Sequence, residues 1–152
     1  MAQERTKRKP LDDYRLACSL PTACGKGCRN ARPDPISMTP FPPDDLVISD
    51  WVMAEFSAAL SIKVRTGQLG PEHRAEALAV FRSMAELSLN IVSVSRMDFA
   101  AAARLSDQHT SGLRAGDALH LAIAANHGYR LVSLDRTLAQ SGLELGVDAR
   151  LL

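Results

Sequence analysis

From Leu46 onward, the sequence alternates short runs typical of β-strands with longer runs typical of amphipathic helices. The strand-like runs are "LVIS" (46–49), "NIVSV" (90–94), "YRLVSL" (129–134) and "GVDARLL" (146–152). The helical patterns lie at 51–67, 72–87, 97–109 and 113–128. Strands that alternate with helices indicate a mainly parallel sheet covered on both faces. The sequence therefore predicts an α/β fold.

Signals at the ends of these runs support the helices. Ser49 or Asp50 can cap the helix that follows "LVIS", and Gly67 can end it. Pro71 is well placed in the first turn of the next helix. The segment 116–127 is apolar nearly all round, which predicts a helix held between the sheet and another helix.

The first 43 residues differ from the rest in composition. They contain seven of the eight prolines and all three cysteines, and residues 1–35 carry a net charge of +4 against −3 for the remainder. Prolines interrupt helices and central strands, so only "YRLACSL" (14–20) could form a short strand here. We therefore predict an irregular, atypical N-terminal segment at 1–43 and a folded domain at 44–152.

The bulk composition excludes several classes of protein. A chain of 152 residues with 46% hydrophobic and 23% charged residues is typical of one globular domain. It contains no apolar run long enough to span a membrane and no secretory signal, so we expect a cytoplasmic protein. Three cysteines argue against a disulfide framework, and Cys24 and Cys28 lack zinc-finger partners. The near-neutral net charge neither demands nor excludes a nucleic-acid substrate.

Three acids belong to three separate units of the predicted fold. Asp117 lies in the first turn of its helix, Asp135 comes directly after "RLVSL", and Glu55 lies in the first turns of the helix after "LVIS". In open parallel sheets the functional site lies at the carboxyl ends of the strands. Three carboxylates gathered there would repel one another unless a cation lay among them. Mg²⁺ and Mn²⁺ prefer oxygen ligands of this kind.

Each of these acids also has a structural interpretation. Asp117 and Asp135 could cap helices, and Glu55 could be a solvated helix residue. His120 lies on the same helix side as Asp117, but we interpret it as a packing or surface residue without a chemical role. Three further acids are interpreted as caps and surface charges: Asp50, Asp98 and Asp107.

The stretches "ISDWVMAEFSAAL" and "LRAGDALHLAIAANHGYRLVSLDRTLA", with the helical pair between them, resemble a PIN domain. The resemblance is closest to the VapC-type ribonuclease toxins of bacterial toxin-antitoxin pairs, and it covers residues 44–152. It implies a three-layer α/β/α sandwich with a mainly parallel sheet that gathers acids around Mg²⁺ or Mn²⁺. By motif match Glu55, Asp117 and Asp135 fall on three of the metal positions. Ser133 matches a small polar position near the metal.

The reaction that the resemblance implies is hydrolysis of RNA phosphodiester bonds. The metal would generate a hydroxide-like nucleophile, position the phosphate and offset its developing charge. Glu55 or Asp135 could orient the attacking water. Arg114 and Arg136 could hold flanking phosphates, or could simply be solvated charges. The resemblance also implies a VapB-type antitoxin partner and a homodimer.

The family's first motif, an apolar strand that ends in an aspartate of the form "YLDTS", is not recognisable. The nearest acids, Asp12 and Asp13 in "PLDDY", precede the possible strand and so point to the opposite edge of the sheet. On sequence alone, the sheet therefore lacks its centre and the metal site lacks one acid. One hypothesis is that residues 1 to about 40 come from a frameshifted reading frame, which a search of the other frames for an "LDTS"-like peptide would test.

These observations leave three functions open. The leading hypothesis is a metal-dependent endoribonuclease toxin that a cognate antitoxin neutralises. The alternative is a catalytically impaired PIN-like scaffold that binds antitoxin or RNA without cleavage, which the missing first aspartate favours. A phospho-acceptor receiver domain is the third, and the lack of any lysine after Lys63 argues against it.

Overall fold

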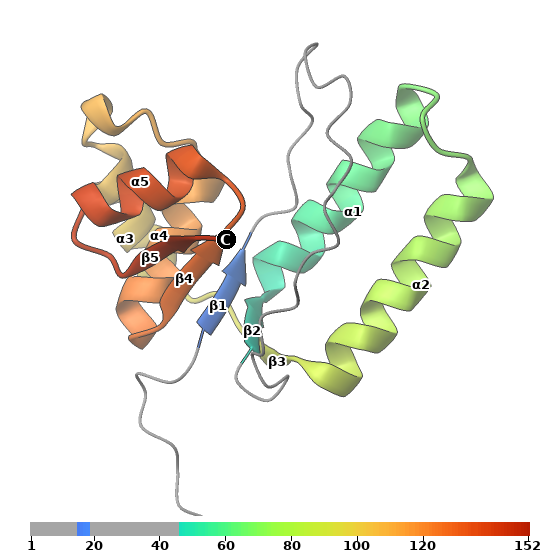
Figure 1. Cartoon of the computed structure of the whole chain (residues 1–152), viewed down its shortest axis with the longest axis horizontal. Coiled ribbons are helices and arrows are strands. Elements are labelled where there is room, and N and C mark those ends of the chain that lie inside the picture. Colours follow the sequence, from blue (N-terminus) through green and yellow to red (C-terminus); the bar gives the residue numbers. More distant parts are fainter. Residues whose placement is uncertain (1–14, 19–45) are drawn as a thin grey trace, which may run out of the picture.

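The structure, a computed structural model, describes residues 15–18 and 46–152 of the chain. Five strands and five α-helices alternate along these residues (Figure 1). In chain order they are β1 (Arg15–Cys18), β2 (Leu46–Ser49), α1 (Asp50–Arg65), α2 (Pro71–Ser88), β3 (Asn90–Val92), α3 (Arg96–Ser106), α4 (Ala115–His127), β4 (Arg130–Ser133), α5 (Arg136–Glu144) and β5 (Ala149–Leu151). The predicted α/β alternation is confirmed, with boundaries that shift by a few residues.

The five strands form one parallel sheet in the order β3-β2-β1-β4-β5. The strand expected within 14–20 is confirmed, and it lies at the centre of the sheet, paired with β2 on one side and β4 on the other. The expectation of a sheet without a centre is therefore wrong. The short run "RLAC" supplies the missing strand, because its backbone alone makes both sets of pairs.

Helices cover both faces of the sheet at the β4 and β5 end. In Figure 1, α5 lies in front of these strands and α3 and α4 lie behind them. The core there is built from α4, whose residues 118–124 are all buried, so the prediction of a helix packed on several sides is confirmed. The approach of α5 is close: a Cβ added at Gly142 would lie 2.6 Å from the Cβ of Ala149 and 2.8 Å from Cδ2 of Leu121.

The other end of the sheet carries the antiparallel pair α1 and α2, which extends away from the strands (Figure 1). A second, smaller core joins this pair to the sheet around Ile48, Val52 and Ala85. Phe56 and Phe81 stack between the two helices with ring centroids 4.0 Å apart. Together the helices and the sheet form the α/β/α sandwich expected from the sequence. Among the described residues, no helix is both long and apolar enough to cross a membrane.

Candidate functional site

The three predicted site acids lie at the starts of helices that are connected to strands of the parallel sheet: Glu55 and Asp135 follow β2 and β4, and Asp117 begins the helix that precedes β4. Glu55 is in the second turn of α1, directly after β2. Asp117 is in the first turn of α4, and Asp135 is the N-cap of α5, two residues beyond the end of β4. Because β2 and β4 run parallel on either side of β1, their carboxyl ends lie at the same edge of the sheet.

Asp117 is partly buried, and the described residues offer its carboxylate little hydrogen bonding. Its Oδ2 accepts one long hydrogen bond, 3.3 Å from the backbone nitrogen of Arg114. Burial raises the pKa of Asp117 and the negative charge of Asp135 raises it further, against the opposing effects of the Arg114 hydrogen bond and of the charges of His120 and Arg114. The net rise means that ionised Asp117 is less stable here than in water. A cation between Asp117 and Asp135 would reverse that.

Asp135 is exposed and performs the capping role that was its structural interpretation. Its Oδ1 accepts hydrogen bonds from the backbone nitrogens of Thr137 at 2.8 Å and Leu138 at 3.2 Å. Its own backbone nitrogen donates to Oγ of Ser133 at 2.9 Å, which fixes the turn after β4. Its Oδ2 makes no hydrogen bond within the described part of the chain. Capping therefore uses one oxygen of Asp135 and leaves the other for a ligand.

Glu55 has a buried partner that the sequence did not reveal. Its Oε2 lies 2.8 Å from Nε2 of His120, and the Glu55 side chain is 36% exposed while that of His120 is 2% exposed. The expectation that Glu55 is simply solvated is wrong. The expectation that His120 is a packing residue is confirmed as to burial, but this side chain also contacts a site acid. In the sequence, "GDALH" shows only that His120 follows Asp117 by three residues and so shares its face of α4.

Three polar side-chain atoms are buried and have no hydrogen-bond partner within residues 15–18 and 46–152: Oγ of Ser49, Nε1 of Trp51 and Nδ1 of His120. Ser49 occupies the N-cap position of α1, yet its side chain makes no capping hydrogen bond. The predicted cap at Ser49 is therefore present in position only. The sequence did not single out Trp51, whose indole lies beside Gly116 and Glu55.

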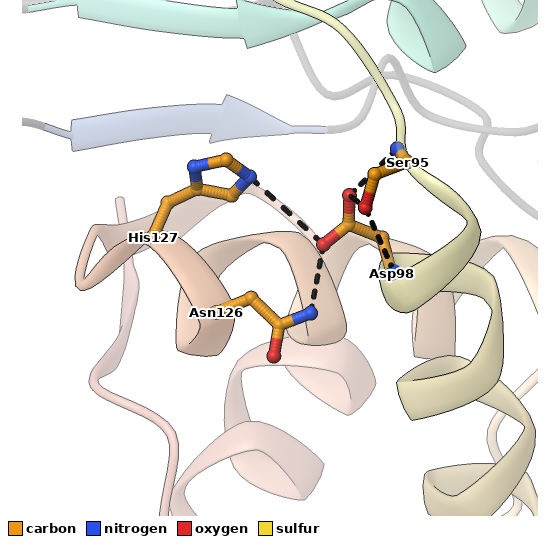
Figure 2. Close-up of polar contacts among 4 residues, drawn as sticks. All are labelled: Ser95, Asp98, Asn126 and His127. Carbon is orange, nitrogen blue, oxygen red and sulfur yellow. Dashed lines mark hydrogen bonds and ion pairs between the residues drawn. The ribbon is translucent and has the colours of Figure 1, made fainter.

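A different acid, Asp98, proves to be buried at the far end of α4. On sequence alone, Asp98 is interpreted as a cap or a surface charge. The capping role is confirmed, because Asp98 forms a capping box with Ser95. The prediction of a surface position is wrong, because the residue is 1% exposed. Figure 2 shows its partners: Oδ2 accepts from the nitrogen and the hydroxyl of Ser95, Oδ1 accepts from Nδ2 of Asn126 at 2.8 Å, and Nε2 of His127 is 3.9 Å from Oδ1. By contrast, Asp50 and Asp107 are exposed at helix ends, as expected.

Burial alone would raise the pKa of Asp98, but the hydrogen bonds from Asn126 and Ser95 and the nearby His127 lower it below its ordinary value. Nine residues separate Asn126 from Asp117, about 14 Å along the helix axis. Asp98 therefore fastens α3 to the end of α4 and takes no part in the candidate site.

The described acids fit a hydrated hard cation better than a preformed metal cage. Within residues 15–18 and 46–152, no group of three or more His, Cys, Asp or Glu side chains is arranged to hold a metal ion. Mg²⁺ is commonly bound by one or two carboxylates, with water and substrate phosphate completing its shell. Asp117 and Asp135 meet that requirement, because capping uses only Oδ1 of Asp135 among the described residues and the hydrogen bond from Arg114 to Asp117 is long. Asp12 and Asp13, the suggested replacements for the first acid, lie outside the described residues, as do Cys24 and Cys28.

Comparison with known proteins identifies the family of the chain and a solved structure with a similar fold. The family model described as "PIN domain" matches residues 35–142. The crystal structure of PAE2754 from Pyrobaculum aerophilum is similar, with a TM-score of 0.52 and 24% sequence identity over 64% of this chain and 62% of that chain. That of FitAcB from Neisseria gonorrhoeae has a TM-score of 0.49 and 16% identity over 69% and 73%.

The chain thus spans less than two thirds of the length of PAE2754, and at this identity the likeness concerns the fold alone. A search of curated proteins found no match.

Proposed function

Because the chain belongs to the PIN-domain family, whose members are generally metal-dependent nucleases, we propose that it is an endoribonuclease toxin of the VapC type. It would hydrolyse RNA phosphodiester bonds with Mg²⁺ or Mn²⁺ and be neutralised by a VapB-type antitoxin. The proposed site consists of Glu55, Asp117 and Asp135.

The observation that carries the proposal is the state of Asp117. This carboxylate is partly buried near the charge of Asp135, and both effects disfavour its ionised form in the absence of a cation. Among the described residues it accepts one hydrogen bond, which is long and does not offset them. Titratable groups perturbed in this way are concentrated at functional sites. Asp98 provides the contrast, since an acid of purely structural role in the same chain is fully hydrogen-bonded.

Each residue has a proposed part in the reaction. Asp117, the second oxygen of Asp135 and Glu55 would bind the metal, which when bound supplies Lewis acidity toward water and phosphate. Glu55, held by His120, or Asp135 would also orient the attacking water. Arg114 and Arg136 are exposed beside the two aspartates, where they could hold flanking phosphates.

Protein partners are part of the same proposal. Val80, Met84 and Leu87 on α2 are 63%, 47% and 82% exposed, and their spacing of four and three residues places them on one face of the helix. An apolar stripe of this kind supports association with another protein. We assign the antitoxin and a second copy of the chain as its candidate partners.

Two observations favour the alternative, a PIN-like scaffold without catalysis. The described residues contain no group of three metal-ligating side chains, and the family's first aspartate is not recognisable in the sequence. Such a protein would bind antitoxin or RNA and leave RNA intact.

RNA cleavage with and without Mg²⁺ or Mn²⁺ separates the two. We expect metal-dependent cleavage that falls at least about a hundredfold in Asp117→Asn, since losing a ligand removes several kcal/mol of charge stabilisation. Asp107→Asn is the matched control, because Asp107 is an exposed acid at the end of α3. Equal and metal-independent rates in all three proteins would discard the enzyme and favour the scaffold.

A further inference from the structure

The Glu55 carboxylate lies against two residues of α4, one on each of its oxygens. We propose that Gly116 and His120 form a seat that fixes this carboxylate in the candidate site, with His120 as a positioning residue. The inference rests on the proposed function, and it adds two residues that the motif match did not assign a role.

His120 holds one oxygen by a hydrogen bond of defined direction. Its Nε2 is 2.8 Å from Oε2 of Glu55. An ionised carboxylate only accepts hydrogen bonds, so Nε2 must carry the proton. The ring cannot turn away, because the residue is 1% exposed and lies in the row of buried residues along α4. A buried ring thus fixes the position of a side chain that is 36% exposed.

Gly116 leaves space for the other oxygen. A Cβ at this position would lie 3.0 Å from Oε1 of Glu55 and 3.5 Å from Nε1 of Trp51. Gly116 does not have a positive φ, so its backbone would accept any residue. The absence of a side chain therefore matters for the approach of Glu55 and not for the turn of the chain. Trp51, packed on the core, closes the same side of the seat.

Gly116, Asp117 and His120 lie within two turns of α4, and each has a different role in the candidate site. Gly116 gives room for the acid from α1, Asp117 contributes its own carboxylate, and His120 orients the acid from α1. Functional side chains need to be held within about 0.5 Å of their working geometry by neighbours that are themselves fixed. A Glu in the second turn of a helix has several rotamers open to it, and this seat selects one of them.

Mn²⁺ binding, measured by electron paramagnetic resonance in the absence of RNA, tests the seat without relying on activity. We expect His120→Leu, which keeps an apolar body of similar size, to weaken Mn²⁺ binding about tenfold or more, as loss of a ligand's supporting hydrogen bond does. His120→Gln should retain most of the affinity, because its amide nitrogen can donate to Glu55 from nearly the same position. Gly116→Ala should weaken binding as well, since the new methyl displaces Oε1.

A double-mutant cycle separates positioning from general stabilisation. If His120 acts through Glu55, then His120→Leu has no further effect on Mn²⁺ affinity once Glu55→Gln is present. The same fold-loss in both backgrounds would overturn the inference. If His120→Leu does not fold, as judged by thermal unfolding in EDTA, the comparison of Gly116→Ala in the wild-type and Glu55→Gln backgrounds provides the same test.

The Mn²⁺-binding experiment gives different results if the inferred seat is wrong and if the proposed function is wrong. Mn²⁺ binding that Asp117→Asn abolishes but His120→Leu and Gly116→Ala leave unchanged would overturn the seat and retain the metal site. Wild-type protein that binds no Mn²⁺, or binds it as well as Asp117→Asn does, would overturn the proposed metal chemistry and the seat's role in it together.

Discussion

Two acids lie at opposite ends of α4, Asp98 of α3 against its last turn and Asp117 in its first turn, and they differ in how their carboxylates are hydrogen-bonded. At the last turn, Asp98 is almost fully buried and both of its oxygens accept hydrogen bonds, so its pKa is lowered despite burial (Figure 2). At the first turn, Asp117 is less buried but accepts one long hydrogen bond and faces Asp135, so its pKa is raised. Burial is therefore a poor guide to function in this protein. What separates the structural acid from the candidate ligand is how completely its oxygens are satisfied.

The largest expected effect is on stability at the Asp98 end. Asp98→Ala should lower the free energy of unfolding by about 3 kcal/mol, because it removes hydrogen bonds to a charged group and leaves buried donors without partners. Urea denaturation measures the change, with Asp107→Ala as the exposed control. A loss smaller than about 1 kcal/mol would remove the distinction between the two ends of the helix.

The next effect should appear at the Asp117 end only when metal is added. Mn²⁺ at ten times its Kd should raise the free energy of unfolding of the wild-type protein by about 1.4 kcal/mol. Asp117→Asn should lose this stabilisation and Asp107→Asn should keep it. Denaturant unfolding at fixed Mn²⁺ checks the difference, and equal stabilisation of both variants would place the ion elsewhere.

Without metal, replacing Asp117 should do little harm. The raised pKa of Asp117 means that its ionised form disfavours the folded state at neutral pH, so Asp117→Asn should raise the free energy of unfolding, by about 0.5 kcal/mol. Denaturation in EDTA at pH 7 measures it. A clear loss of stability would show that Asp117 is structural, as Asp98 is.

The smallest expected effect is the pH dependence of the free energy of unfolding of the Asp98 and Asp117 variants relative to wild type. For Asp98 the folded pKa is below the ordinary value of 3.8, so its stabilisation is full above that value and is lost as the pH falls through the lower, folded pKa. For Asp117 the folded pKa is above 3.8, so the advantage of Asp117→Asn is present at neutral pH and disappears as the pH falls from the folded pKa to 3.8. Unfolding of both variants between pH 7 and pH 3 should therefore separate them, with Asp117→Asn converging on wild type at the higher pH. If the Asp98 variant converged on wild type at a higher pH than Asp117→Asn, both pKa directions would be contradicted.

The sequence predicted the strands and the first four helices after Leu46 because most of them carry their own periodicity or end signals. It indicated α5 only as a short helix that Asp135 could cap. It also placed Glu55, Asp117 and Asp135 at one edge, since parallel strands share their carboxyl ends. It did not reveal that Glu55 meets His120, because 65 residues separate the pair and no local pattern encodes a contact between two helices. The Asp98 network shows the same limit. "SRMD" predicts a cap at Ser95, but burial against Asn126 depends on how α3 packs on α4.

The place of β1 has a consequence for the order in which the protein folds. Its register joins Cys18 to Ser133, which are 115 positions apart in the chain, whereas β2 and β3 join residues less than half as far apart. During synthesis β1 therefore emerges before the other described strands, and it must wait until residues 130–133 have been made before β4 is available to pair with it. Pairings of such long sequence separation form slowly and expose unpaired strand edges meanwhile. Asp135 follows β4, so a nascent chain cannot bring the acids of the candidate site together until β4 and the start of α5 have been made.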